Sequence, residues 1–150
     1  MSPTPIVDSS RPQAANDTRS GGRNLSDDER RGGHTLARHV GRTDDDLRAR
    51  LSRERQISAA STYTDRETAE RVVGDTLGRE ARRLDSWRRR GGPRANLALD
   101  YHGARDEIIG RSLRRGAGAS VPCSDAIVVL RWDERAQDFY VLTSYPEVRR

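Results

Sequence analysis

The sequence predicts an α+β domain in which N-terminal helices pack on a largely antiparallel β-sheet. Between residues 34 and 90 most apolar residues recur at helical spacing, whereas from residue 97 onward they alternate and are rich in β-branched and aromatic types. Helices come first and strands afterwards, without the alternation of βαβ units, which favours antiparallel pairing. The 150 residues suffice for one domain with a modest core.

The first part of the chain is poor in apolar side chains. Residues 1–31 are rich in Ser, Pro, Asp, Asn and Arg, so we expect a disordered leader or linker there. Ser26 and Glu29 match a capping box, which predicts a transient helical turn. We place the start of the ordered domain at residue 32, which gives a domain over residues 32–150.

Two short helices are expected between residues 32 and 51, separated at Gly41. Thr43 followed by three aspartates is typical of a helix N-cap with an acidic first turn, which the positive end of the helix dipole stabilises. Four apolar residues fall at spacings that predict one buried stripe over both helices, namely Leu36, Val40, Leu47 and Leu51.

A strand and a long helix follow. Residues 57–63 have the β-branched and aromatic content of a short strand. Thr64, with Glu67 three residues later, predicts the capped start of an amphipathic helix that is interrupted at Gly78 and ends by Gly91. Its apolar face consists of Ala69, Val72, Val73, Leu77, Ala81, Leu84 and Trp87.

Three consecutive arginines, residues 88–90, close this helix. They complement the negative end of the helix dipole. We interpret them first as a solvated helix terminus and second as a patch that contacts phosphate.

The remainder of the chain predicts strands. Residues 133–138 form the turn of a hairpin, and Pro146 is expected to end its second strand. The four strand candidates cover residues 97–101, 108–113, 126–132 and 139–145.

The basic residues are all arginines. The formal net charge is +5, and residues 1–33 contribute nothing to it because five arginines offset five acids there. A guanidinium matches phosphate bidentately, so this surplus favours nucleic acid or an acidic protein as partner. A codon bias would explain the arginine content equally well.

Cysteine and histidine spacing argue against metal sites. The single cysteine, Cys123, allows no intramolecular disulfide and no zinc site built on thiolates, and we interpret it as a small core or loop residue. His34 and His39 are five residues apart and do not form the i,i+4 pair of helical metal sites. We therefore expect no metal and no cofactor. No apolar run reaches the length of a membrane span.

Two pairs of residues suit chemistry on phosphate. His39 and Arg50 combine a titratable imidazole with a permanent cation. Thr143 and Tyr145 are two residues apart on a predicted strand, so they share one face and could donate hydrogen bonds to phosphate oxygens. Strict alternation places Phe139 and Val141 on that same face. An ordinary exposed strand end is the alternative interpretation of these hydroxyls.

Five motifs occur in an order that resembles the bacterial RNase A-like toxin domain, the C-terminal nuclease domain of contact-dependent growth inhibition and other polymorphic toxins. The resemblance extends over residues 32–146 and implies an RNase A-type fold without disulfides. It also implies metal-independent cleavage of RNA, with tRNA as a possible substrate, through attack of the ribose 2′-hydroxyl on the adjacent phosphate. The motifs lie at residues 33–41, 47–51, 60–70, 121–122 and 141–146.

The resemblance places the family's functional residues on His39, Arg50, Thr143 and Tyr145. His39 would act as general base on the 2′-hydroxyl or as general acid on the 5′-oxygen, and Arg50 would stabilise the developing charge. Thr143 and Tyr145 would hold the phosphate. Pancreatic-type ribonucleases use two histidines, and since the C-terminal strand supplies none here, His34 is the candidate for the second imidazole.

The resemblance implies two partners, an RNA substrate and an immunity protein that we expect to be acidic. The free domain should be monomeric, delivered by a parent toxin, and active in the cytoplasm of the target cell. The alternative is a non-catalytic basic module that binds RNA or another protein. Only 5% of the residues are aromatic, which leaves few platforms for stacking on single-stranded RNA.

Overall fold

The predicted α+β class is confirmed by the computed structural model, which describes residues 22–149. None of the helices in this part of the chain combines the length and apolar character that crossing a membrane requires. In chain order the elements are α2 (Leu25–Arg30), α3 (Thr35–His39), α4 (Asp44–Arg53), β1 (Ala59–Tyr63), α5 (Arg66–Arg79), α6 (Ala81–Arg88), β2 (Leu97–His102), β3 (Gly110–Arg114), β4 (Val121–Cys123), β5 (Asp125–Asp133) and β6 (Asp138–Glu147).

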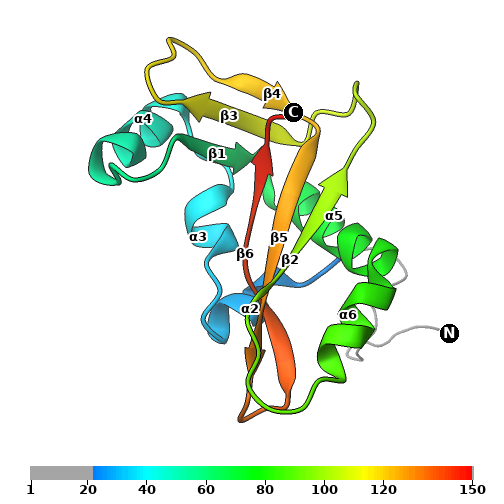
Figure 1. Ribbon diagram of the computed structural model, residues 1–150. Coiled ribbons are helices and arrows are strands. Elements are labelled where there is room, and N and C mark those ends of the chain that lie inside the picture. The colour runs from blue at the N-terminus through cyan, green and yellow to red at the C-terminus, as the bar shows by residue number, and fades with distance from the viewer. Residues whose placement is uncertain (1–21, 150) are drawn as a thin grey trace, which may run out of the picture.

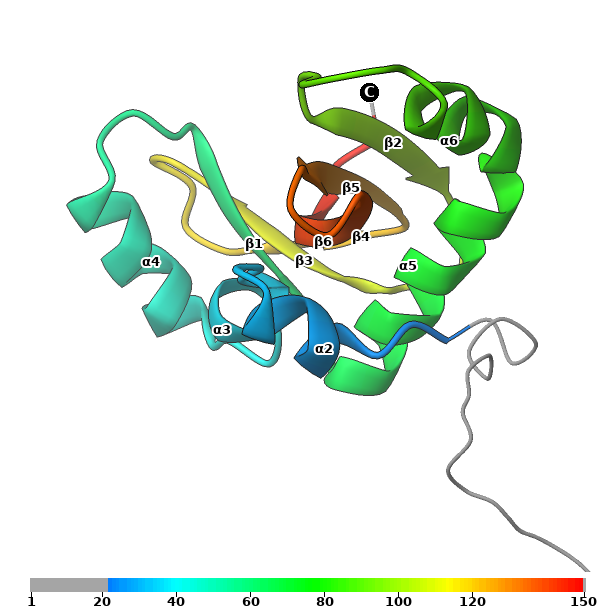
Figure 2. The same ribbon diagram turned by 90° about the horizontal axis from the view of Figure 1, so that it is seen from below.

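The strands form two antiparallel sheets, one with the order β1-β3-β4 and one with the order β2-β5-β6. The β5–β6 hairpin runs through the middle of the molecule, with α5 and α6 on one side and α2 and α3 on the other (Figures 1 and 2). Strand β6 also contacts β1 and β3, so it belongs to one sheet and lies against the other. The predicted single sheet is therefore divided in two, and β6 joins the halves.

The main core lies between the β2-β5-β6 sheet and helices α5 and α6. It contains the expected face of the long helix, with Leu84 and Trp87 buried against the sheet. The hydroxyl of Tyr63 lies 2.6 Å from Ser144 Oγ, a buried hydrogen bond that ties β1 to β6. This bond and the apolar contacts hold the two sheets together.

A second, smaller core lies between α4 and the β1-β3-β4 sheet, which corrects the expected single stripe. Leu47 and Leu51 belong to this smaller core, whereas Leu36 and Val40 pack against the main one. Gly41, with φ +67°, turns the chain between α3 and α4 and so separates the two pairs.

Helix ends follow local hydrogen bonding. Thr43 is the N-cap of α4, as the sequence predicts, and it also forms a capping box with Asp46. The next long helix is capped by Asp65 and not by Thr64, because the Asp65 carboxylate accepts from the Thr68 N–H. It is interrupted at Glu80, two residues after the predicted Gly78.

Two strand predictions need correction. Residues 121–123 form β4, which is too short and too Pro-rich to show in a pattern. Strand β6 continues through Pro146 to Glu147 instead of ending there. Because β6 is the edge strand of its sheet, the missing N–H of Pro146 can face away from the ladder.

The start of the fold lies earlier than residue 32, so that boundary is wrong. Leu25, on α2, is fully buried in the main core. Asn24 caps α2, and Glu29 accepts hydrogen bonds from the first N–H groups of α3, so the proposed Ser26–Glu29 capping box does not form. Residues 1–21, where we also expected a leader, lie outside the described residues.

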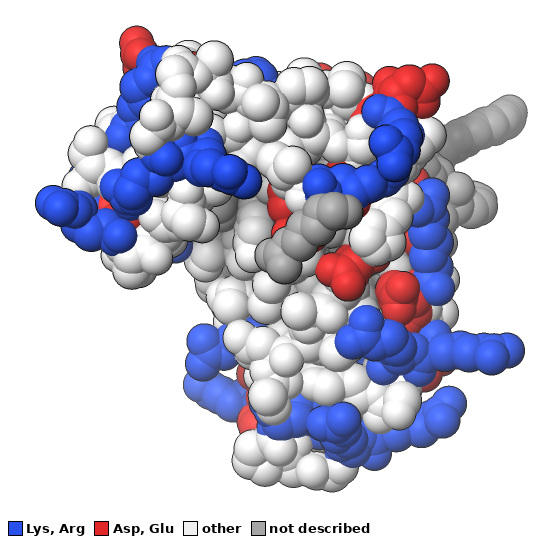
Figure 3. Space-filling view, turned by 45° about the horizontal axis from the view of Figure 1, so that its top comes forward, with Lys and Arg blue, Asp and Glu red and all other residues white. Residues whose placement is uncertain are grey.

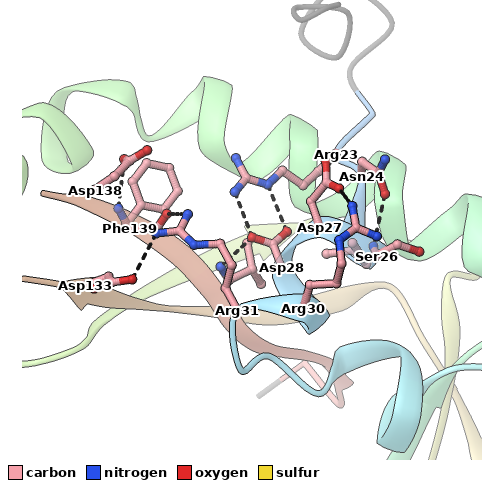
Figure 4. A network of polar contacts seen from close by, with 12 residues as sticks. Arg23, Asn24, Ser26, Asp27, Asp28, Arg30, Arg31, Asp133, Asp138 and Phe139 are labelled. Atoms are coloured by element: carbon pink, nitrogen blue, oxygen red, sulfur yellow. Dashed lines mark hydrogen bonds and ion pairs between the residues drawn. The ribbon is translucent and has the colours of Figure 1, made fainter. Parts of the chain in front are cut away.

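Helix α2 is fixed to β6 through a buried carboxylate, Asp28 (Figure 4). Its oxygens accept from Arg23 Nη2 at 2.8 Å, Arg23 Nε at 3.0 Å and the Val141 N–H at 2.9 Å. Beside it, Arg31 Nη1 donates to the carbonyl oxygen of Phe139 at 2.9 Å. The side chain of Asp28 is only 1% exposed, so these bonds replace water completely.

We expect Asp28→Ala to destabilise the protein by about 3 kcal/mol, because it leaves the buried Val141 N–H and the Arg23 guanidinium without their acceptor. Urea unfolding at pH 7 would measure the loss. Asp27→Ala is the matched control, since Asp27 is exposed and pairs only with Arg30 at the surface. Equal stability of the two variants would mean that α2 is not part of the cooperative fold.

Candidate functional site

A cleft of about 980 Å³ opens beside β6, between the two sheets. All five residues singled out in the sequence line it, together with residues of β1, β3 and the end of the chain. Arginine side chains gather on the lobe that contains α4, β1 and β3, at the upper left of Figure 3. The five predicted site residues, which lie on α3, α4 and β6 or directly before α3, are His34, His39, Arg50, Thr143 and Tyr145.

A β-bulge in β6 turns two of these side chains into the cleft. The register of β6 against β5 shifts at Leu142, which has no partner across the ladder. On one side of the bulge Val141 is buried in the main core, and on the other side Ser144 takes the buried position. Thr143 and Tyr145 consequently line the cleft.

The expected shared face of these residues with Phe139 and Val141 is therefore wrong. Strict alternation assumes an unbroken ladder, whereas one extra residue reverses the facing of everything after it. Phe139 and Val141 fill the core, whereas Thr143 and Tyr145 line the cleft.

Gly33 allows α3 to lie directly against β6. A side chain at this position would collide with the carbonyl oxygen of Val141. In its absence the His34 N–H donates to the carbonyl oxygen of Leu142 at 2.9 Å. This bond sets α3, and with it both imidazoles, beside the bulged strand.

His39, the last residue of α3, is 4% exposed at the base of the cleft. Its Nδ1 lies 3.4 Å from the carbonyl oxygen of Ser61 and 3.5 Å from Arg50 Nη1. Donation from Nδ1–H to that carbonyl leaves Nε2 with its lone pair. The imidazole ring lies 5.4 Å from the Tyr145 ring, between centroids.

Burial, and secondarily the Arg50 cation, lowers the pKa of His39 to about 4. The imidazole is therefore neutral at pH 7. A neutral imidazole with a free Nε2 can accept a proton but has none to give.

His34 supplies a second imidazole to the same cleft. Its ring centroid is 6.4 Å from that of His39, and its Nδ1 is buried without a hydrogen-bond partner among the described residues. Burial, followed by the Arg38 cation, lowers the pKa of His34.

Arg50 is held in place by a carboxylate one helical turn away. Glu54 accepts from Arg50 Nε at 3.1 Å and from Nη2 at 3.5 Å, which leaves Nη1 directed at His39. The hydrogen bond from Arg50 lowers the pKa of Glu54, so the carboxylate remains ionised at neutral pH. One edge of the guanidinium is thus occupied while the other faces the cleft.

Two hydroxyls of β6 that line the cleft, those of Thr143 and Tyr145, can act as hydrogen-bond donors. Thr143 Oγ1 is buried and has no partner within the described part of the chain. A buried unpaired hydroxyl is unfavourable, and a bound anion would satisfy it. Burial, followed by the Glu147 charge, raises the pKa of Tyr145, so its phenol keeps its proton at pH 7.

The cleft also holds residues that the sequence argument missed. Arg38 precedes His39 and lies one helical turn after His34, a spacing that could have identified it. Arg114 comes from β3, and nothing in its local sequence distinguishes it from other arginines. Among residues 22–149, no three His, Cys, Asp or Glu side chains lie close enough together to hold a metal ion.

Comparisons with known proteins give two matches. The family model described as the bacterial CdiA-CT RNAse A domain matches residues 33–146. The crystal structure of a CdiA-CT/CdiI complex from Y. kristensenii 33638 contains a chain that is 30% identical, with a TM-score of 0.68. That match covers 77% of this chain and 99% of the other. None of the curated protein sequences matches significantly.

The lowered pKa of His39 makes the fold less stable in mild acid. The imidazole pKa is about 4 in the folded protein and 6.5 in the unfolded chain, so the unfolded state binds more protons between these values. We expect the free energy of unfolding to fall by about 2 kcal/mol from pH 7 to pH 5 through this group.

Urea unfolding at both pH values would measure this loss. His39→Gln should abolish most of the difference, whereas the exposed control His102→Gln should retain it. An unchanged difference in His39→Gln would show that His39 does not titrate as described.

Proposed function

The chain belongs to the family of bacterial CdiA-CT RNase A domains, which makes it the ribonuclease toxin domain of a contact-dependent growth inhibition system, and on that premise we propose that it cleaves RNA by metal-independent transphosphorylation. The observation that supports this mechanism most is the meeting of two imidazoles, a guanidinium and an unpaired hydroxyl in one cleft. Each group matches one need of phosphodiester chemistry.

His39 acts as the general base. Its Nε2 takes the proton of the ribose 2′-hydroxyl while the 2′-oxygen attacks the adjacent phosphorus, and a pentacoordinate phosphorane forms. The Ser61 carbonyl supports this assignment because it accepts from Nδ1–H and fixes the tautomer that leaves Nε2 free. The neutral state of His39 at pH 7 meets the same requirement.

Arg50 and Thr143 stabilise the phosphorane. The Nη1 of Arg50 and the Thr143 hydroxyl donate to the non-bridging oxygens, on which negative charge accumulates. Tyr145, which remains a phenol, adds a third donor. Glu54 keeps the Arg50 fork oriented, so the charge is in place before RNA arrives.

His34 acts as the general acid. It donates a proton to the departing 5′-oxygen, so the products are a 2′,3′-cyclic phosphate and a free 5′-hydroxyl end. The pKa of His34 is lowered in the free protein, and a phosphate bound in the cleft opposes this by favouring the imidazolium.

The chain also needs an inhibitor in the cell that makes it. The related Y. kristensenii chain was crystallised in a CdiA-CT/CdiI complex, and we propose a corresponding immunity protein for this chain. The net charge of +5 supports an acidic partner. Delivery by a parent toxin would then bring the free, monomeric domain to RNA, with tRNA as a candidate, in the cytoplasm of the target cell.

Incubation of the purified domain with total RNA and with tRNA in excess EDTA tests the mechanism. We expect cleavage with 2′,3′-cyclic phosphate ends, and a loss of at least about 100-fold in His39→Ala because the general base is removed. His102→Ala, at an exposed histidine outside the cleft, should cleave normally. Normal cleavage by a folded His39→Ala variant, or full inhibition by EDTA, would contradict the proposal.

Thr143→Val separates function from stability. The substitution removes one donor to the phosphorane and should lower kcat at least about tenfold. It should leave the stability unchanged or higher, because the hydroxyl it removes is buried and has no partner in the part of the chain that the structure describes.

Thr76→Val is the control, since Thr76 Oγ1 is also buried but donates to the Val72 carbonyl, far from the cleft. It should lose about 1 kcal/mol of stability and keep its kcat. A Thr143→Val variant that is destabilised but fully active would assign Thr143 to the fold alone.

A further inference from the structure

One short segment away from the cleft carries a high density of positive charge. Residues 79–94, which cover the end of α5, α6 and the following loop, contain seven arginines and two carboxylates. Their net charge of +5 equals that of the whole chain, so the remaining residues together sum to zero. Within that remainder the elements around the cleft are also basic, since residues 34–63 and 110–123 contain nine arginines and four carboxylates. Figure 3 shows a second group of arginine side chains in the lower part of the face, apart from the group on the α4 lobe.

Four of the seven arginines have structural partners. Each binds a carbonyl oxygen or a carboxylate of a neighbouring element, or lies over an aromatic ring. They are Arg79, Arg83, Arg88 and Arg94. The other three, Arg82, Arg89 and Arg90, are exposed and their guanidinium groups have no partner within residues 22–149.

The end of α6 does not need Arg89 or Arg90 as a cap. Arg94 Nη1 donates to the carbonyl oxygens of Trp87 at 2.8 Å and Arg88 at 3.0 Å. The backbone N–H groups of residues 89 and 90 donate to the carbonyl oxygens of Asp85 and Trp87. Arg89 and Arg90 are exposed, as expected for a solvated helix terminus, and because neither guanidinium caps the helix, both are available to contact an anion.

The loop that holds the arginines is firmly attached. The Arg94 guanidinium stacks on the Trp132 ring at 3.8 Å from its centroid, and Trp87 Nε1 donates to the carbonyl oxygen of Ala95 at 2.9 Å. Arg89 and Arg90 thus extend from a fixed support, which lowers the entropy lost when they bind an anion.

The surface around these arginines suits nucleic acid better than protein. Protein interfaces have an apolar, often aromatic centre, whereas nucleic-acid interfaces are polar and strongly positive. The apolar residues of α6, Leu84 and Trp87, are buried beneath the surface. The large hydrophobic side chains exposed in the described part of the chain are Ile108, Val121 and Val148, none of which lies in the segment.

We propose that Arg82, Arg89 and Arg90 form a second phosphate-binding surface, which holds the backbone of an RNA substrate outside the cleft. This inference rests on the proposed ribonuclease function. Helix α6 and the α4 lobe lie at opposite sides of the central hairpin (Figure 1), so only an extended or folded RNA can reach both. A dinucleotide in the cleft cannot.

The triple variant R82Q/R89Q/R90Q, in which the cleft is intact, tests the surface. We expect its KM for tRNA to rise about tenfold at physiological salt while kcat stays unchanged, because the lost contacts bind substrate without touching the reacting phosphate. Cleavage of a dinucleoside monophosphate should equal that of the wild type. In a catalytically inactive His39→Ala background, the log–log salt slope of tRNA binding should become shallower by about two units.

The variant R30Q/R66Q/R105Q removes the same charge at exposed arginines beside carboxylates and should retain the wild-type KM. An equal rise in KM in both triple variants, or no rise in R82Q/R89Q/R90Q, would contradict the proposed phosphate-binding surface. Loss of affinity for the immunity protein with unchanged tRNA cleavage would overturn it as well. Failure of the wild type to cleave any RNA would instead refute the proposed function. The dinucleotide assay distinguishes the two cases, because it measures cleavage in the cleft independently of the second surface.

Discussion

The unpaired residue in β6 is the constraint on which both the core and the cleft depend. Without the bulge at Leu142, a strand of ten residues would present one face to the core and the other to solvent along its whole length. With it, the first half fills the core between the sheets and the second half turns Thr143 and Tyr145 towards the imidazoles. Buried anchors hold the strand on both sides of the bulge, Asp28 at Val141 and Tyr63 at Ser144.

The cleft concentrates features that oppose stability. An imidazole is buried beside a guanidinium, which disfavours its charged form, and a hydroxyl and a ring nitrogen are buried without partners among residues 22–149. These three groups line the cleft, while two further buried polar atoms without such partners, Thr35 Oγ1 and Trp132 Nε1, lie outside its lining. The stability that compensates for them comes from the apolar core and the Asp28 network.

Much of this architecture could be predicted from the sequence, and the failures share a cause. Local rules identified the Thr43 N-cap, the face of the long helix and the β5–β6 hairpin, because short-range spacing determines them. A transient helical turn was expected near α2, but its place in the ordered fold was missed. One buried leucine in a polar segment gives no periodic signal, and Val141, the partner of Asp28, is 113 residues away. The bulge was missed for a related reason, since an insertion in a ladder shows only against the paired strand.

The candidate site residues were identified through family resemblance, whereas other residues around them could be identified only from the structure. The position of Arg114 in the cleft depends on how β3 packs beside β6, and the cap that Arg94 provides depends on a loop that doubles back over α6. The concentration of arginines in residues 79–94 was visible in the sequence. Its interpretation depended on knowing which of these arginines have hydrogen-bond, ion-pair or aromatic partners within the fold.

The attachment of α2 to β6 also determines the stage of folding at which the core closes. Its bonds join residues more than 100 positions apart, and β6 is the last strand of the chain. Such distant pairings form late, because the intervening chain must first be brought together. A chain that is unfolded during synthesis or transport, with no disulfide to constrain it, therefore has neither a closed core nor an assembled cleft until β6 docks.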